Sequence, residues 1–482
     1  MIAGMADTIY LSRRRFALSA AGALAAPWFA ARGAAPEAGW SGPAVVRKVY
    51  LAGARPSWPR PDADLGQNVA EIEARLEEIQ RMYPGQVRFT GGEMIRNAAE
   101  MSAWLEKPDD ADVVLAFNMV TIVYPLLKLL VASGKPSLMF ALPYSGHDWT
   151  HAAAFIQRGA KLDLVASSDF RDLDGYLPLF RTIHHLRHSK VMLMSPPTGR
   201  PRGAEAFTTR FGTAFSYPSY LDLKACYDGA DAARAARMAD EFIRQASKVV
   251  EPTRPEIVDS MRLYLGIQKL MEQEKANAIA IDCLGGFGRK ELPAYPCVAF
   301  SRLNDDGLYG VCENDLESTM TQLLVTSFSG MPGFVSDPVF DTSRNEVIHA
   351  HCVSATKMEG IHGKSSPYMV RSHLEDHKGV SMQVLAPGGA SVTVAKFADA
   401  GRLMVSGGEA LGNVDDERGC RTKIRTRVKD AARLLHGWAA ALDTPAMPGT
   451  RDLLHRVVFY GDHMTPVERL GRLTGFKVIQ EG

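Results

Sequence analysis

The stretch YGVCENDLESTM, residues 309–320, places the carboxylate of Glu313 between an apolar segment and a helix-like run. The apolar approach predicts a strand, and residues 314–330 predict a helix. In open α/β sheets, ligands bind just beyond the carboxyl ends of the strands. A surface acid stabilised by the dipole of the following helix would have the same sequence pattern. A functional Glu313 therefore requires partner side chains elsewhere in the chain.

The length and composition indicate a large globular protein. A chain of 482 residues exceeds one ordinary core and predicts two or three domains. The hydrophobic content of 46% and the charged content of 23% are typical of soluble proteins. The net charge is +1, and no basic stripe with interleaved aromatic residues occurs, so we expect no nucleic-acid partner.

The N-terminal segment LSRRRFALSAAGALAAPWFAARGAAP, residues 11–36, is typical of a twin-arginine export signal. We expect residues 1–36 to be this signal, with cleavage between Ala30 and Pro36, and the mature protein to be periplasmic or secreted. The apolar run is short and rich in alanine, so we expect no stable membrane span after cleavage. The alternative is an accidental arginine cluster ahead of an apolar helix.

Solidly apolar strands that alternate with helices predict an α/β fold, with two Rossmann-like doubly wound domains. We expect the first at residues 44–175 and the second at residues 186–335. In the second, residues 221–230 are interpreted as a strand and turn and residues 295–303 as a strand. His184, His185 and His188 are interpreted as solvent-facing residues of a charged helix.

The remaining residues, 336–482, show a different pattern. Short strands separated by Gly and Pro turns predict an antiparallel, β-rich, barrel-like domain. A closing α/β segment follows, with a strand from His455, a helix over residues 465–475 and a last strand.

Six cysteines are scattered over the second and third regions without a CxxC pair, so their spacing suggests neither a zinc knuckle nor a redox pair. We expect most of them to be buried free thiols, because they lie in apolar contexts. They are Cys226, Cys283, Cys297, Cys312, Cys352 and Cys420.

Asp337 is the first candidate partner of Glu313. It follows 24 residues later, which leaves room for one helix and a returning parallel strand. We therefore expect both acids to cap adjacent strands and to face one crevice. Asp341 is a nearby competitor, but its turn context favours a turn-forming role.

Two carboxylates with a histidine form a site suited to manganese or magnesium. The candidate histidines are His349, His351 and His455. Strand alternation places His349 and His351 on the same face, so their positions alone do not separate them.

The order of these motifs resembles the L-fucose/L-arabinose isomerase superfamily. Cys312-Glu313-Asn314-Asp315 is similar to the family segment that supplies a metal-binding glutamate. Asp337 matches the second acid, and His455, followed by Gly461-Asp462, matches the closing histidine segment. Leu454 departs from the pattern, since many members have a histidine there.

The resemblance implies a metal-dependent aldose–ketose isomerase that acts through an enediol. Glu313 and Asp337 would be the acid/base pair and also ligands of Mn2+ or another divalent cation. His455 would be a third ligand and His351 a fourth. The resemblance further implies a monosaccharide substrate and a homo-oligomer, either a trimer or a hexamer.

A polar segment, residues 364–379, contains Arg371 and His373, which we interpret as substrate-binding residues. We expect strand alternation to place both on one face with Glu375 and His377. A solvated or oligomer-contacting face is the alternative. Two other functions stay open for the chain: an exported, non-enzymatic sugar-binding protein, and an inactive isomerase-like scaffold.

Overall fold

The computed structural model describes residues 42–53, 58, 60–438 and 454–481. The predicted twin-arginine segment lies outside these ranges, so it stays a prediction, as does the export that it implies. Within the described ranges, no helix combines the length and the apolarity that a bilayer crossing requires.

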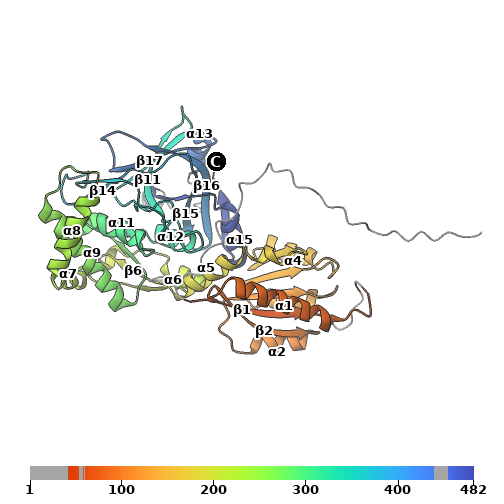
Figure 1. Cartoon of the computed structure of the whole chain (residues 1–482). Coiled ribbons are helices and arrows are strands. Elements are labelled where there is room, and N and C mark those ends of the chain that lie inside the picture. Colours follow the sequence, from red (N-terminus) through yellow and green to blue (C-terminus); the bar gives the residue numbers. More distant parts are fainter. Residues whose placement is uncertain (1–41, 54–57, 59, 439–453, 482) are drawn as a thin grey trace, which may run out of the picture. The chain divides into compact units, whose positions relative to one another are not determined.

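The first sheet is fully parallel, with the strand order β2-β1-β3-β4-β5. Helices connect its strands, and every residue of the inner strand β1 is buried (Figure 1). The strands are β1 (Ala44–Leu51), β2 (Val87–Ile95), β3 (Val113–Asn118), β4 (Ser137–Ala141) and β5 (Leu162–Ala166). The helices are α1 (Leu65–Met82), α2 (Ala98–Glu106), α3 (Tyr124–Ala132) and α4 (Trp149–Gln157).

The second sheet is also parallel, with the order β10-β9-β6-β7. Its strands are β6 (Lys190–Met194), β7 (Ala214–Ser216), β9 (Ala278–Ile281) and β10 (Tyr309–Cys312). The helices of this region are α5 (Leu177–His188), α6 (Ala204–Phe211), α7 (Tyr220–Asp228), α8 (Ala232–Gln245), α9 (Arg254–Glu274), α10 (Cys283–Gly288), α11 (Cys297–Asp305) and α12 (Leu316–Ser329). The α/β prediction is thus confirmed for both sheets.

Two segments predicted as strands in this region are helices. Residues 221–228 belong to α7, whose start is fixed by a capping box between Ser219 and Asp222, and residues 229–230 follow the helix as the predicted turn. Residues 295–303 largely form α11, which begins directly after Pro296. Seven of the nine α11 residues are buried, including the polar residues Ser301 and Asn304, so its polar residues do not mark a solvent-facing side.

The third region contains a closed antiparallel β-barrel of six strands, which confirms the barrel-like prediction. The strands follow the order β15-β18-β11-β12-β17-β16, and β16 pairs back with β15. They are β11 (Phe334–Asp341), β12 (Glu346–His351), β15 (Ser391–Asp399), β16 (Arg402–Asn413), β17 (Thr422–Arg427) and β18 (Arg456–Tyr460). The other elements are β8 (Lys248–Val249), β13 (Tyr368–Arg371), β14 (Ser381–Val384), α13 (Ala431–Gly437), α15 (Met464–Thr474) and β19 (Lys477–Gln480).

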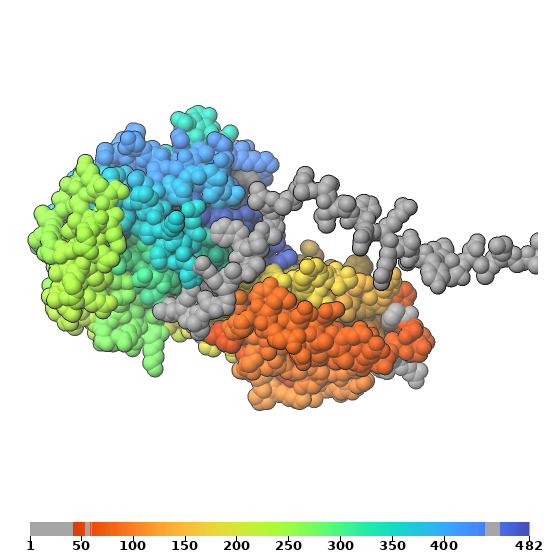
Figure 2. Space-filling model, viewed as in Figure 1, coloured from red at the N-terminus to blue at the C-terminus, as the bar shows by residue number. Residues whose placement is uncertain are grey.

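Helix α12 joins the second sheet to the barrel. Twelve of its fourteen residues are buried, because it packs on β9 and β10 and also on α5, β15 and β18. The backbone N–H of Phe397 on β15 donates to the Thr321 hydroxyl at 2.9 Å. In the space-filling view, the green segments and the cyan and blue barrel segments lie against one another (Figure 2). The segment around Glu313, which leads into α12, therefore lies next to the barrel.

Two of the three histidines on α5 contradict their predicted exposure. The His184 side chain is only 13% exposed, and its Nδ1 atom lies 2.8 Å from the Asp112 carboxylate. The His185 side chain is buried, and its Nε2 atom lies 3.1 Å from the Tyr309 hydroxyl of β10. Burial, reinforced by the charge of Arg181, lowers the pKa of His185 from 6.5 to about 3. His188, on the same helix, is exposed as predicted.

The depressed pKa of His185 predicts a loss of stability in mild acid. Between pH 6.5 and 3 the unfolded chain binds a proton here that the folded chain does not, so the free energy of unfolding falls as the pH falls. Urea unfolding at pH 7 and pH 5 should show that His185→Gln reduces this loss by about 2 kcal/mol. His188→Gln is the control and should keep the full loss, whereas equal losses in both variants would contradict the assignment.

Candidate metal centre

Glu313 lies where the sequence predicts it, directly after strand β10 and ahead of α12. Glu313 and Asn314 both adopt left-handed backbone conformations, with φ of 58° and 53°. Such conformations cost non-glycine residues of order 1–3 kcal/mol each and concentrate at functional sites. The Asn314 N–H donates to the carbonyl of Ile281 at 3.0 Å, which holds this turn against β9.

Asp337 reaches the site by a different route from the predicted one. It lies on β11 of the barrel, opposite Ala350 of the antiparallel strand β12, and not on a parallel neighbour of β10. The expected single crossover is wrong because the chain leaves the second sheet after α12 and enters the barrel. Asp341 forms the predicted turn, accepting from the Ser343 hydroxyl at 2.6 Å.

His351 and His455 lie near the two acids, whereas His349 has other partners. The Nε2 atoms of His351 and His455 lie 3.8 and 3.9 Å from the Glu313 Oε1 atom. The His455 Nε2 atom is also 3.2 Å from the Asp337 Oδ1 atom. His349 instead has Ser336 at 3.0 Å and Thr426 at 3.2 Å on its two ring nitrogens.

Three buried donor atoms in this cluster have no hydrogen-bond partner within the described part of the chain. They are Oδ1 of Asp337, Nε2 of His351 and Nε2 of His455. One ligand atom from each of these residues lies within 4.8 Å of the others. A buried polar atom without a partner costs about 1–3 kcal/mol, and a bound divalent cation would satisfy all three at once. Two imidazoles with neighbouring carboxylates are a suitable donor set for manganese.

The two histidines differ in how well they are prepared to bind a cation. The Nδ1 atom of His455 lies 2.8 Å from Asp315, which orients its Nε2 atom toward the acids. The Nδ1 atom of His351 accepts from the backbone N–H of Cys352 at 2.9 Å, an arrangement that places the ring proton on Nε2. His351 must therefore change tautomer or turn its ring to bind a cation through Nε2, whereas His455 is already oriented.

Asp315 holds His455 through a buried charge network that the sequence analysis did not single out. Its Oδ2 atom accepts from Lys396 Nζ at 2.8 Å and from the Ser318 hydroxyl at 2.8 Å, in addition to contacting His455. Lys396 lies inside the apolar strand β15 and is 1% exposed. A lysine within such a strand was the sequence signal that could have revealed this network, because lysines are rarely buried without a charged partner.

The charges of the network set the ionisation of its members. Burial disfavours the charged form of Asp315, but the charges of Lys396 and His455 lower its pKa. Burial likewise opposes charging of His455, but its contacts with Asp315 and Asp337 raise its pKa to about 9. At Glu313 and Asp337, burial favours the neutral carboxyl, but the contacts with His351 and His455 have the larger effect. The pKa of each acid is therefore lowered. Both acids are therefore ionised at neutral pH.

The two kinds of donor differ in access to solvent. The side chains of His351 and His455 are 6% and 0% exposed, while those of Glu313 and Asp337 are 17% and 30% exposed. The histidines thus form the inner side of the cluster and the carboxylates the outer side. A substrate would meet the carboxylates first. Asn314, beside Glu313, is 4% exposed, and neither polar atom of its side chain has a partner within the described chain.

The predicted substrate-binding residues make contacts within the protein. Arg371 binds Glu251 at 2.8 Å and Glu417 at 3.0 Å, and His373 lies 3.3 Å from Asp376. Strand β13 ends at Arg371, so the expected alternation through residue 377 is wrong. The turn that follows is stabilised by the Asp376 carboxylate, which accepts from the Lys378 N–H.

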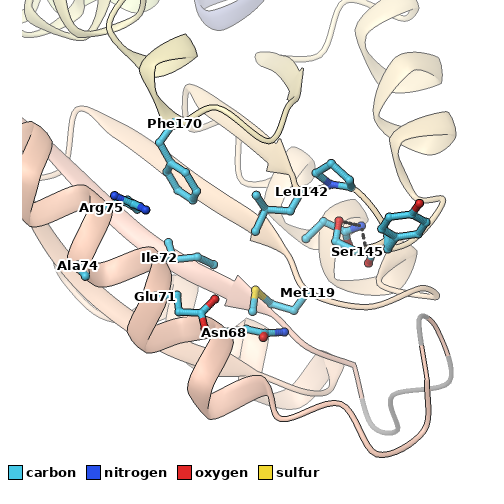
Figure 3. Close-up of a pocket in the computed structure, with 12 residues that line it drawn as sticks. Asn68, Glu71, Ile72, Ala74, Arg75, Met119, Leu142, Ser145 and Phe170 are labelled. Atoms are coloured by element: carbon cyan, nitrogen blue, oxygen red, sulfur yellow. Dashed lines mark hydrogen bonds between the residues drawn. The ribbon is translucent and has the colours of Figure 1, made fainter. Parts of the chain in front are cut away.

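A separate cavity of about 510 Å³ lies at the carboxyl ends of β3 and β4, next to α1 (Figure 3). Glu71 and Arg75 come from α1, Leu142 and Ser145 come from the loop beyond β4, and Phe170 begins a short 3-10 helix after β5. None of the donors around Glu313 lines it. The Asn118 amide at its base donates to the Ser145 carbonyl at 3.2 Å.

Comparison with known proteins gives a local match to a sugar isomerase. No family model matches the chain. Over 88 residues, the chain is 28% identical to the sulfoquinovose isomerases of Priestia megaterium and Priestia aryabhattai. The matched segment covers 18% of this chain and 20% of each relative, so the match spans about a fifth of the relatives' length.

Removal of a prepared ligand should weaken metal binding. We expect wild-type protein to bind Mn2+ with the cluster, and His455→Gln and Asp337→Asn to weaken that binding by at least about tenfold. Isothermal titration of metal-free protein with MnCl2 measures this. His349→Gln is the matched control, a buried barrel histidine whose nitrogens are already occupied, and it should bind as wild type does. Equal weakening in this control would contradict the proposed ligand set.

Loss of the Asp315 carboxylate, which contacts His455, should lower the affinity for Mn2+ without removing a metal ligand. Asparagine can still cap α12, so Asp315→Asn tests orientation of the imidazole more than formation of the helix. We expect Mn2+ affinity to fall about 10–100-fold. Titration of samples with native circular dichroism measures it, and unchanged affinity would show that Asp315 does not position the ligand.

Proposed function

We propose that the protein is a metal-dependent aldose–ketose isomerase acting on a monosaccharide. The observation that carries the proposal is the convergence of two ionised, partly accessible carboxylates with two buried histidine nitrogens that lack partners. The local similarity to sulfoquinovose isomerases supports the reaction class. Assembly into a trimer or hexamer is part of the proposal as well.

Isomerisation moves a proton between C1 and C2 of an open-chain sugar. Asp337, His455, His351 and Glu313 would hold the cation, which supplies stabilisation of the negative charge that develops on the sugar oxygens. We assign to one of the two acids, Glu313 or Asp337, the removal of the proton from C2 of the aldose and its return to C1. The other acid moves the hydroxyl proton from O2 to O1, so that C1 becomes an alcohol and C2 the ketone. Positioned proton transfer of this kind contributes about 10²–10⁴-fold in rate.

The environment of the acids suits this role. The lowered pKa of each keeps a carboxylate in the basic form at neutral pH, and a base must be ionised before it can take a proton. The left-handed turn at Glu313 holds its carboxylate at the outer side of the cluster. His455, fixed by Asp315, cannot rotate away without losing a buried hydrogen bond.

The test is to incubate the protein with MnCl2 in D2O and a panel of aldoses and ketoses. The panel includes sulfoquinovose, the sugar in the relatives' name. NMR should show interconversion of one pair, with deuterium at C1 of the ketose formed. Glu313→Gln should lower kcat/KM by about 10²-fold or more. Asp341→Asn, on the same strand as Asp337 but held in a turn, is the control and should retain activity.

The other outcomes separate the alternatives. Binding of a sugar without conversion, in protein free of metal, would support a non-enzymatic receptor. Absence of both conversion and Mn2+ binding would support an inactive scaffold. Either result would overturn the proposed isomerase.

A further inference from the structure

A second set of metal donors overlaps the manganese cluster and contains sulfur. One ligand atom from each of Cys312, Glu313 and His351 lies within 4.8 Å of the others. Cys312 is the last residue of β10, and its side chain is 5% exposed. The isomerase chemistry uses no thiol, so the function proposed above leaves this cysteine unexplained.

A fourth donor is adjacent. The Cys283 sulfur lies 3.0 Å from the Cys312 sulfur, and Cys283 is 3% exposed. The pair is built by the sheet: β9 and β10 are parallel neighbours, and the two cysteines lie at their carboxyl ends. Sulfurs bound to one zinc ion at 2.3 Å lie about 3.8 Å apart, so the pair would open by less than 1 Å.

The His351 ring provides an independent indication of a ligand here. Its Nε2 atom is buried and has no hydrogen-bond partner among the described residues. The same imidazole belongs to the set with Asp337 and His455. A single ring nitrogen binds one ion at a time, so occupation of one set removes His351 from the other.

We propose that Cys312, Glu313 and His351, with Cys283 as fourth donor, form a zinc site. Zinc bound there prevents manganese from binding to the neighbouring cluster, which shares Glu313 and His351. Thiolates select zinc and related soft cations, whereas manganese favours the carboxylate and imidazole side. When zinc binds, the Cys312 and Cys283 thiols release their protons to solvent and zinc–sulfur bonds form. The His351 ring turns or changes tautomer, so that its proton is carried by Nδ1 and Nε2 is free to bind the ion. No electron transfer is involved. Zinc would therefore block the carboxylate centre by taking Glu313 and His351.

Cobalt is the probe, because a cobalt–thiolate bond absorbs strongly in the near ultraviolet, whereas carboxylate and imidazole ligands do not. Full-length protein is reduced with a phosphine, freed of metal and titrated with CoCl2. We expect a sulfur-to-cobalt charge-transfer band that ZnCl2 abolishes at stoichiometric amounts. This readout is spectral, so its failure is distinguishable from a failure of the isomerase assay.

Two cysteine variants and one control show which thiols give rise to the sulfur-to-cobalt band. Cys312→Ser should lose it and bind zinc at least about tenfold more weakly, while Mn2+ titration still shows binding at the Asp337 side. Cys283→Ser should weaken the band, which keeps the test decisive if Cys312→Ser does not fold. Cys226→Ser, whose thiol contacts Gln273 elsewhere, should keep it.

The proposal is overturned if reduced wild-type protein shows no such band, or if Cys312→Ser retains it. It is also overturned if the two thiols stay joined as a disulfide after reduction, because no thiolate is then available. Simultaneous, non-competing binding of zinc and manganese would contradict the shared use of His351.

Discussion

The buried carboxylate of Asp315 connects the parts of this structure that must come together. It caps α12 through the Ser318 N–H at 2.8 Å, pairs with Lys396 of the barrel and contacts His455 beside β18. The helix belongs to the second sheet, while the lysine and the histidine belong to the barrel region. One acid therefore sets the register between two parts of the fold and orients the His455 nitrogen that we propose as a metal ligand.

Such a network is costly unless it is complete. Each buried charge loses several kcal/mol of hydration, and the loss is offset only where every polar atom finds a partner. Asp315, Lys396 and Ser318 satisfy one another, whereas the outward nitrogen of His455 and the Asp337 oxygen facing it do not form a hydrogen bond at 3.2 Å. The incomplete part of the network is thus where a cation would bind. The strained turn at Glu313 lies on the same side, which is consistent with a site maintained for chemistry rather than for stability.

Periodicity and strand composition were enough to predict the parallel sheets and the barrel. They failed at two helices: α11 buries polar as well as apolar residues, so its polar residues do not mark a solvent-facing side, and α7 depends on a short cap. The acids and histidines were identified from residue chemistry and motif order. The route of Asp337 was not, because strand pairing across a barrel is non-local. The partners of Lys396 and Cys283 were missed for the same reason, since Asp315 and Cys312 lie far from them in the chain.

The central claim is that Asp337, His455 and their neighbours bind one cation. Anomalous diffraction at the manganese absorption edge, on crystals of the metal-free protein soaked in MnCl2, tests it most directly. The account predicts one strong peak within bonding distance of the Asp337 carboxylate and the His455 Nε2 atom. No peak there, or a peak held by other residues, would contradict it.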